Sequence, residues 1–341
     1  MAPSTPPTIH EVAALAGVSR STVSRILNSS TGGPPETRKR VEAAASTLGY
    51  RPSSAARSLR SGRSDLIALI VGDIRQPYFG SLARSLEHAA EASGRGVLLL
   101  DIDRSMERLR STLARARSIP LDGLVVAVGL DIDVPEIREP LMQLQSSGVS
   151  VVTVTQHLRY SPIPSVTVAH ADAAHSAVET LRSKGNKQIA LVVGDADAPH
   201  DRASTRGFLD ALPHDEREHA AAHLILRGSF QPGSTQEAVT ALLQSGHRPD
   251  AFVTTSTFAT LGLLNALEDL GLRETADIVC TEHTEVLDFL RPRVMSYGVD
   301  YEEYASAILT TLDAAAEGRP AQIVVDAPPV DPNRLYGSVG S

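Results

Sequence analysis

Hydroxyl and guanidinium side chains are concentrated in a nine-residue stretch near the amino end of the chain. Residues 19–27 read Ser-Arg-Ser-Thr-Val-Ser-Arg-Ile-Leu and contain two arginines, three serines and one threonine. Such side chains donate hydrogen bonds to phosphate oxygens and to the edges of nucleic-acid bases. On an exposed helix they could contact a polyanion, and they could equally form an ordinary solvated face.

The surrounding sequence predicts two short helices joined by a tight turn. Thr8 and Glu11 have the spacing of a capping box, so the first helix should begin there. Gly17 interrupts the apolar periodicity as a helix end does, and Ser19 can cap the second helix. The inward-facing residues expected for the two helices are Val12, Leu15, Ala16, Val23, Ile26 and Leu27. This is helix-turn-helix spacing, in which the amino end of the second helix projects outward.

The charge is distributed unevenly along the chain. Residues 1–63 contain nine basic and three acidic side chains, although the whole 341-residue chain has a net charge of −8. The first 63 residues are therefore +6 and the remainder −14. This asymmetry is expected when only one end of a protein meets a polyanion. Together with the helix-turn-helix spacing it favours a DNA-binding head over a purely structural bundle of three helices, the third running from Pro35 to Gly49.

From Leu66 onward, predicted strands alternate with amphipathic helices. The strand candidates are short and apolar: 66–71, 97–101, 123–128, 151–155, 165–169, 189–193, 251–254 and 277–281. Repeated alternation predicts parallel sheets covered by helices on both faces. About 275 residues exceed what one such sheet usually holds, so we expect an α/β body of two Rossmann-like lobes.

The expected domain organisation has three parts. The helix-turn-helix head occupies 1–50, a hinge helix and linker 51–65, and the two-lobe body 66–341. The hinge segment is too short to form a stable helix alone and should become helical only when supported. The expected lobe boundaries are about 66–163 and 296–322 for the first lobe, and about 164–293 and 323–336 for the second.

No sequence pattern indicates an enzyme. The sequence has no GxSxG, Walker A or HExxH motif. His219 and His223 are four residues apart, but in a polar stretch where histidines are usually solvated. Cys280 is the only cysteine, which excludes an intramolecular disulfide and a cysteine-based zinc cage. We therefore expect no catalytic residues, no metal site and no cofactor.

The apolar runs are strand-sized and do not approach the roughly 18 residues that a membrane span needs. The first eight residues lack a positive cluster and an apolar core, so a secretory signal is not expected. The sequence alone thus favours a cytoplasmic protein with no membrane partner.

The head closely resembles a known protein family. Residues 8–28, TIHEVAALAGVSRSTVSRILN, are similar to the head of the lactose-repressor (LacI/GalR) family of bacterial transcriptional regulators. The resemblance continues through residues 35–74 and, more weakly, through KGNKQIALVVG at 184–194 and Arg206-Gly207-Phe208. It implies a sequence-specific regulator, expected to be a repressor, that binds a pseudo-palindromic DNA operator as a homodimer and responds to a small molecule. The alternatives are a regulator with a degenerate pocket controlled by a protein partner and, from the lobes alone, a solute-binding protein.

The resemblance also implies roles for residues of the head and the hinge. Base edges would be read by Arg20, Ser21 and Arg25, where one bidentate Arg–guanine contact contributes about 1–3 kcal/mol of discrimination. Phosphates would be bound by Thr8, Ser19, Thr22, Ser24 and Asn28. In the hinge, Leu59 would wedge into the minor groove and kink the duplex, while Ala56 would pack against the partner subunit.

In the body, the resemblance is to the periplasmic-binding-protein fold, whose cleft closes on a small molecule. The implied effector-binding positions are Tyr78, Phe79, Thr155, His170, Arg202, Ser204, Phe230, Thr257, Thr284 and Tyr301. The aromatic positions are kept, whereas the family's carboxylates and arginine are replaced. Polyols are held by carboxylates and a bidentate arginine, so a typical monosaccharide is not expected. The sequence leaves open a ring-shaped effector with few hydroxyls and a pocket that binds nothing.

Overall fold

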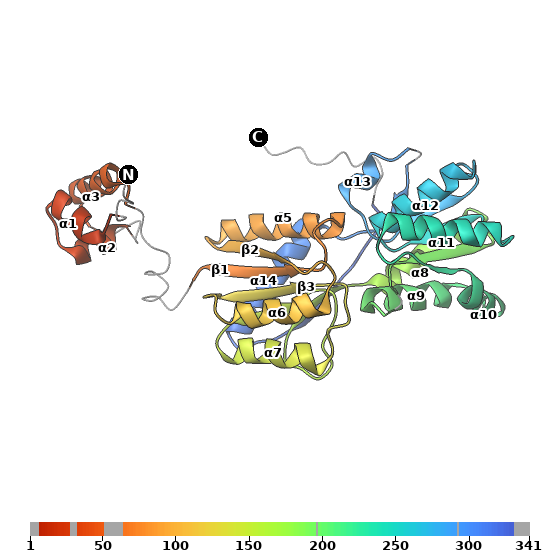
Figure 1. Cartoon of the computed structure of the whole chain (residues 1–341), viewed down its shortest axis with the longest axis horizontal. Helices are drawn as coiled ribbons and strands as arrows, with labels where there is room; N and C mark the ends of the chain where they lie inside the picture. Colours follow the sequence, from red (N-terminus) through yellow and green to blue (C-terminus); the bar gives the residue numbers. More distant parts are fainter. Residues whose placement is uncertain (1–6, 28–32, 51–63, 196, 292, 331–341) are drawn as a thin grey trace. The chain divides into compact units, whose positions relative to one another are not determined.

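The structure, a computed structural model, describes residues 7–27, 33–50, 64–195, 197–291 and 293–330 (Figure 1). Contacts divide the chain into two units, Met1–Ser64 and Asp65–Ser341. In the part of the chain that the structure describes, no helix is long and apolar enough to cross a membrane.

Three helices of the first unit pack around a small apolar core. They are α1 (Ile9–Ala16), α2 (Arg20–Leu27) and α3 (Pro35–Leu48). Gly17 after α1 and Gly49 after α3 have φ angles of 66° and 64°, the left-handed conformation that glycine adopts without steric cost. The buried residues are Val12, Ala13, Ala16, Val23, Ile26, Val41, Ala44 and Ala45. The three predicted helices are confirmed.

Leu15 is an exception to the predicted core. Its side chain is 56 % exposed, whereas Ala13 is buried. Helix α1 contacts both α2 and α3, so its buried stripe runs through Val12, Ala13 and Ala16. Position 15 therefore faces solvent, although it has helical spacing from Val12.

The second unit contains two parallel sheets. The six-stranded sheet has the order β11-β5-β4-β3-β1-β2, and the five-stranded sheet has the order β10-β9-β8-β6-β7. We call the two sheets with their helices the N-lobe and the C-lobe. The N-lobe elements are β1 (Leu66–Val71), α5 (Pro77–Ala92), β2 (Gly96–Asp101), α6 (Met106–Ala116), β3 (Gly123–Ala127), α7 (Pro135–Ser146), β4 (Ser150–Thr153), β5 (Ser165–Val168), α14 (Tyr301–Ala316) and β11 (Gln322–Val325). The C-lobe elements are α8 (His170–Ser183), β6 (Ile189–Val193), α9 (Pro199–Ala211), α10 (His214–His223), β7 (Ile225–Arg227), α11 (Pro232–Gln244), β8 (Ala251–Thr254), α12 (Thr257–Asp269), β9 (Asp277–Cys280), α13 (Glu285–Asp288) and β10 (Met295–Ser296).

The N-lobe sheet is covered on both faces, as its continuous apolar strands predict. In β1, Ile67, Leu69 and Val71 pack with residues of α5 and α14 on one face. Ala68 and Ile70 pack with residues of α6 and α7 on the other face. This alternation is the two-residue period of a strand, and both sets are fully buried.

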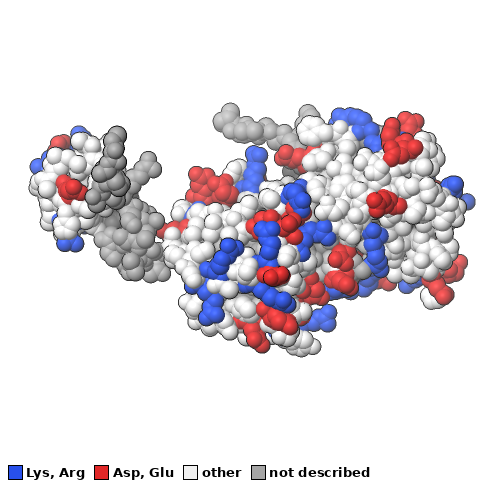
Figure 2. All heavy atoms as spheres, in the orientation of Figure 1, with Lys and Arg blue, Asp and Glu red and all other residues white. Residues whose placement is uncertain are grey.

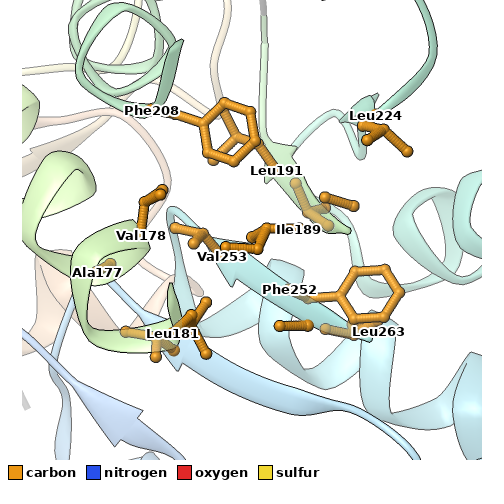
Figure 3. Packing of buried hydrophobic residues seen from close by; sticks show 14 of the residues in the cluster. Ala177, Val178, Leu181, Ile189, Leu191, Phe208, Leu224, Phe252, Val253 and Leu263 are labelled. Carbon is orange, nitrogen blue, oxygen red and sulfur yellow. The ribbon is translucent and has the colours of Figure 1, made fainter. Parts of the chain in front are cut away.

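The C-lobe repeats this arrangement, with α8 paired to α9 and α11 paired to α12 (Figure 1). Figure 3 shows Leu191 beside Phe208, and Phe252 beside Leu263. Gly207 lies where α8 and α9 meet: a Cβ atom on it would be 2.0 Å from the Ala171 carbonyl oxygen. The absence of a side chain there allows the two helices to approach closely.

The expected lobe boundaries need correction. Strand β5 pairs with β4, and β11 pairs with β5, so both strands belong to the N-lobe and not to the second lobe. Strand β10, Met295–Ser296, pairs with β9 in the C-lobe. The chain therefore crosses between lobes after β5, after β10 and again after β11, where Pro329 bridges to Tyr297. Strands β7, β10 and β11, of three, two and four residues, were not predicted from the sequence.

Charged side chains of both signs interleave on the visible face of the second unit (Figure 2). In the N-lobe, the Arg75 guanidinium contacts the carboxylates of Asp73 and Asp103, each over 2.8 Å. The charge of Arg75 is therefore balanced locally, whereas the head carries a net positive charge.

Candidate functional sites

Side-chain hydrogen bonds cap the first turns of both α1 and α2. The Thr8 amide and hydroxyl both donate to Glu11 Oε2, over 2.6 and 2.9 Å, and so fix the start of α1. These hydrogen bonds lower the pKa of Glu11 below its ordinary value. At the start of α2, Ser19 Oγ accepts the Thr22 amide hydrogen over 3.2 Å. Both predicted caps are present, so the polar face of α2 has a defined orientation on the head.

The residues expected to read bases lie on the exposed side of α2. Arg20, Ser21 and Arg25 are exposed, whereas Val23 and Ile26 are buried. Neither arginine has a carboxylate partner among the described residues of the head. These two exposed guanidinium groups, five residues or about 1.4 helical turns apart, can each donate two parallel hydrogen bonds to a planar acceptor pair.

The hydroxyl side chains beside them form a small hydrogen-bonded group. Ser19 Oγ lies 2.8 Å from both Ser21 Oγ and Thr22 Oγ1. Thr22 and Ser24 are partly buried on the flank of α2. This group lies next to the arginines, as phosphate contacts require. Asn28, Ala56 and Leu59 lie outside the described residues.

The second site is a pocket between the two lobes of the body. It has a volume of about 880 Å³, counting the space at its mouth. Residues that follow the carboxyl ends of strands line it from both lobes, including Gly72, Gly129 and Thr155 of the N-lobe and Asp195 and Glu282 of the C-lobe. Ligands bind at this edge of parallel sheets because the strands end there and the loops diverge.

Six of the ten expected effector residues line this pocket: Tyr78, Phe79, Thr155, His170, Phe230 and Tyr301. The Tyr78 ring lies 5.1 Å from that of Phe79 and 6.1 Å from that of Tyr301. Tyr301 donates its hydroxyl hydrogen to the His283 carbonyl over 3.2 Å, and Thr155 donates to the Val128 carbonyl. Burial raises the pKa of Tyr78. These residues therefore offer a ligand mainly ring faces and edges.

Two strained loops meet across the pocket. Asp103 and Arg104 have φ angles of 47° and 58°, and Ser229 and Phe230 have φ angles of 50° and 53°. The Arg104 guanidinium carbon lies 5.3 Å from the centre of the Phe230 ring, a cation–π distance. Consecutive non-glycine residues in the left-handed region are costly and are typical of ligand clamps.

The imidazole rings of His200 and His170 continue the row of aromatic rings that begins at Phe230. The His200 ring lies 5.4 Å from Phe230 and 5.6 Å from His170. Burial, and the neighbouring His200, lower the pKa of His170 to about 3, so His170 is neutral at physiological pH. The buried Nδ1 of His200 has no hydrogen-bond partner among the described residues. A bound molecule with a complementary polar atom could satisfy it.

Several polar residues of the pocket were not predicted from the sequence, among them Arg104, Asp195 and Glu282. Glu282 is one whose protonation the pocket changes. It is the second residue after β9, and its Oε1 accepts the Thr257 amide hydrogen over 3.0 Å. Burial, with a smaller effect from the Asp201 carboxylate, raises its pKa to about 7 despite the hydrogen bonds from Thr257. Near neutral pH this carboxyl can either donate or accept a hydrogen bond. The strand-end position was the signal that could have identified it.

Comparisons with known proteins agree with this geometry. Residues 8–53 match the model of bacterial regulatory proteins of the lacI family, and residues 64–310 match that of periplasmic binding proteins and the sugar-binding domain of the LacI family. Catabolite control protein A of Priestia megaterium is 30 % identical over 292 residues, which cover 85 % of this chain and 86 % of that protein. This chain belongs to the LacI family. It is a DNA-binding transcriptional regulator.

One further relative in sequence and one solved structure with the same fold are similar to this chain over nearly its whole length. The regulator AscG of Escherichia coli K12 is 28 % identical over 318 residues, 91 % of this chain and 92 % of that protein. The crystal structure of the lac repressor dimer bound to operator and the anti-inducer ONPF has the same fold. Its TM-score is 0.82 at 23 % identity, covering 96 % of this chain and 98 % of that one.

The other four expected effector residues of this LacI-family protein do not line the pocket. Arg202 is exposed and forms an ion pair with Asp131. Ser204 is 1 % exposed, and Thr257 Oγ1 and Thr284 Oγ1 share a buried hydrogen bond of 2.8 Å. Thr284 was expected to contact the effector, but Glu282, two residues earlier in the chain, lines the pocket instead. The expectation that the pocket lacks a carboxyl group is therefore wrong.

Proposed function

We propose that the chain is a homodimeric repressor whose α2 helices read the two halves of a pseudo-palindromic operator. The observation that carries this proposal is the exposed pair Arg20 and Arg25 at helix-turn-helix geometry, without carboxylate partners among the described residues. The lac repressor, a relative in fold, has been solved as a dimer on its operator, which supports a symmetric complex here. A two-fold arrangement of heads imposes two half-sites about one or more helical turns apart.

Selection of bound genomic fragments by the full chain tests this proposal. We expect enrichment of one inverted repeat, protection of both half-sites in footprinting, and lower transcription of the adjoining gene when the protein is present. The double variant Arg20→Ala/Arg25→Ala should lose the enrichment. Arg138→Ala, which removes an arginine from the N-lobe and not from the head, is the matched control and should keep the enrichment. Enrichment of a single, asymmetric half-site would contradict the dimeric reading.

We further propose that the pocket binds a ring-shaped effector with few hydroxyls, which modulates the affinity for DNA. Tyr78, Phe79, Phe230 and Tyr301 supply aromatic surface, and His170 and His200 extend it. Glu282 and the unpartnered His200 Nδ1 supply polar contacts at defined points. We favour a flat heterocycle with polar edges over a polyol because aromatic and imidazole rings supply much of the lining, while Arg104, Asp195 and Glu282 can contact the polar edges. We expect no enzymatic activity, and the comparisons give no support to control by a protein partner.

A thermal-shift screen of sugars, sugar phosphates, nucleobases and small aromatic acids tests the effector proposal. A ligand at about 100 times its dissociation constant adds roughly 2.7 kcal/mol to the free energy of unfolding. This corresponds to a rise of a few degrees in Tm. The rise should disappear in Phe230→Ala and persist in Phe289→Ala, whose ring is 82 % exposed and outside the pocket lining. A clear rise with glucose or ribose would overturn the proposed ligand class.

A further inference from the structure

Three histidines lie together on the surface of the C-lobe. His219 and His223 are one turn apart on α10, and their ring centres are 5.0 Å apart. The His247 ring, in the loop after α11, lies 6.2 Å from His219 and 5.6 Å from His223. None of the three lines the interlobe pocket. His219 and His223 were expected to be merely solvated, because their spacing in the sequence does not reveal that His247 lies beside them.

The hydrogen bonds of Ser245 determine which nitrogen of His247 is available. Ser245 Oγ donates its only hydrogen to the Leu242 carbonyl over 2.7 Å. It therefore accepts the Nδ1–H of His247, which lies 2.9 Å away. In the neutral ring this leaves the lone pair on Nε2. Metal-binding histidines are oriented in the same way, by a second residue that holds the other ring nitrogen.

The loop that carries His247 is also held in place. The Arg248 guanidinium donates to the Leu243 carbonyl and, over 2.8 Å, to the His247 carbonyl. His247 is half-buried, whereas His219 and His223 are exposed. The His247 ring is thus held by its neighbours. The His219 and His223 side chains project from α10 one turn apart, and because they are exposed their rings can rotate.

We propose that His219, His223 and His247 form a binding site for a divalent transition-metal ion such as Zn²⁺. Imidazole nitrogens suit Zn²⁺, Cu²⁺ and Ni²⁺, whereas Ca²⁺ and Mg²⁺ prefer oxygen ligands. Three imidazoles at Zn–N distances of about 2.0–2.1 Å and near-tetrahedral angles have ring centres about 5 Å apart. The observed ring-centre separations are 5.0, 5.6 and 6.2 Å, so the rings must approach one another slightly to bind an ion. Water would complete the fourth position.

The site requires a rearrangement of side chains only. With the side chains as they stand, no group of three or more acidic, histidine or cysteine residues in the described part of the chain is placed to hold a metal ion. The proposal therefore requires the exposed His219 and His223 rings to turn toward Nε2 of His247 so that the three nitrogens face one point. The ion would then connect α10 to the loop after α11 and stabilise the C-lobe, because it binds the folded chain and not the unfolded one.

Titration of the metal-free full chain with Zn²⁺, followed by calorimetry and by Tm, tests this proposal. We expect one equivalent to bind and to raise Tm, and Co²⁺ in its place to give the visible absorption of a tetrahedral site. His223→Ala and His247→Ala should each weaken Zn²⁺ binding at least about tenfold, and Ser245→Ala about tenfold. His214→Ala, on the same helix but outside the trio, is the matched control and should bind as the wild type does.

Three results would overturn the site. The first is no binding of Zn²⁺ at 100-fold excess over micromolar protein. The second is binding unchanged in the double variant His223→Ala/His247→Ala, which would place the ion elsewhere. The third is binding equal to wild type in His247→Ala, which would reduce the site to a two-histidine chelate on α10. The three rings are at the surface, so circular dichroism of each variant should match that of the wild type.

Discussion

Asp131 and Arg202 form an ion pair between the two lobes: Arg202 Nη2 donates to Asp131 Oδ2 over 2.9 Å. Asp131 lies between β3 and α7 in the N-lobe, and Arg202 lies on α9 in the C-lobe. Burial would raise the pKa of Asp131, but hydrogen bonds from Arg202, the Asp133 amide and Gln156 together lower it. The pair therefore stays charged at neutral pH and connects the lobes outside the pocket lining.

A double-mutant cycle with Asp131→Asn and Arg202→Gln should give a coupling energy of about 0.2–1 kcal/mol at pH 7, because both side chains are partly exposed. The folded-state pKa of Asp131 is lowered, so this stability is present above the ordinary aspartate pKa of about 3.9 and is lost as pH falls through the folded value. Urea unfolding of the wild type and the three variants, from pH 7 downward, measures this coupling energy and its loss at low pH. A coupling of zero at pH 7 would show that the contact contributes nothing.

Replacement of Arg25 by alanine should relax the base preference at one position of each half-site by about 1–3 kcal/mol. Thr22→Ala should instead weaken binding to all sequences about equally, because a phosphate contact carries no sequence information. Binding to a set of single-base operator variants separates the two effects. If Arg25→Ala weakened every variant alike, the base-reading role would be abandoned.

Substitution of Glu282 by glutamine should raise the free energy of unfolding by about 1–3 kcal/mol at pH 8. The pKa of this carboxyl is about 7 in the folded chain, above its ordinary value near 4.5, because burial disfavours the charged form. The folded state thus holds the proton longer, and the wild type loses stability as pH rises from about 4.5 to 7. Denaturation at pH 5 and pH 8 measures the difference, which should shrink at the lower pH. A difference that does not change with pH would contradict the raised pKa.

Gly207→Ala should lower the free energy of unfolding by about 1–3 kcal/mol or more, because the added methyl group meets the α8 backbone. Gly80→Ala in α5 is the matched control, since nothing lies within 4 Å of its Cβ position. It should raise stability by about 0.5–1 kcal/mol through the helix propensity of alanine. Thermal unfolding of both variants under one condition provides the test. Equal stabilities would indicate that α8 and α9 can separate without cost.

The sequence by itself determined the features that depend on neighbouring residues in the chain. The caps at Thr8 and Ser19, the stop at Gly17 and the buried stripe of α2 follow from local hydrogen bonding and helical periodicity. The alternation of apolar strands and amphipathic helices likewise predicted two covered parallel sheets. Six of the ten expected effector residues could be located in the pocket because strand ends and helix starts in this fold converge there.

Only the tertiary structure decided which distant segments meet. The partner of Arg202 is 71 positions away in sequence, and the ring of His247, in the loop after α11, meets two histidines of α10. Glu282 became a pocket residue, and Leu15 an exposed one, through packing that no local pattern records. The lobe boundaries depended on pairing between β5 and β11, more than 150 residues apart. Such contacts form by burial and close approach between elements, so their geometry is set by the packed chain as a whole.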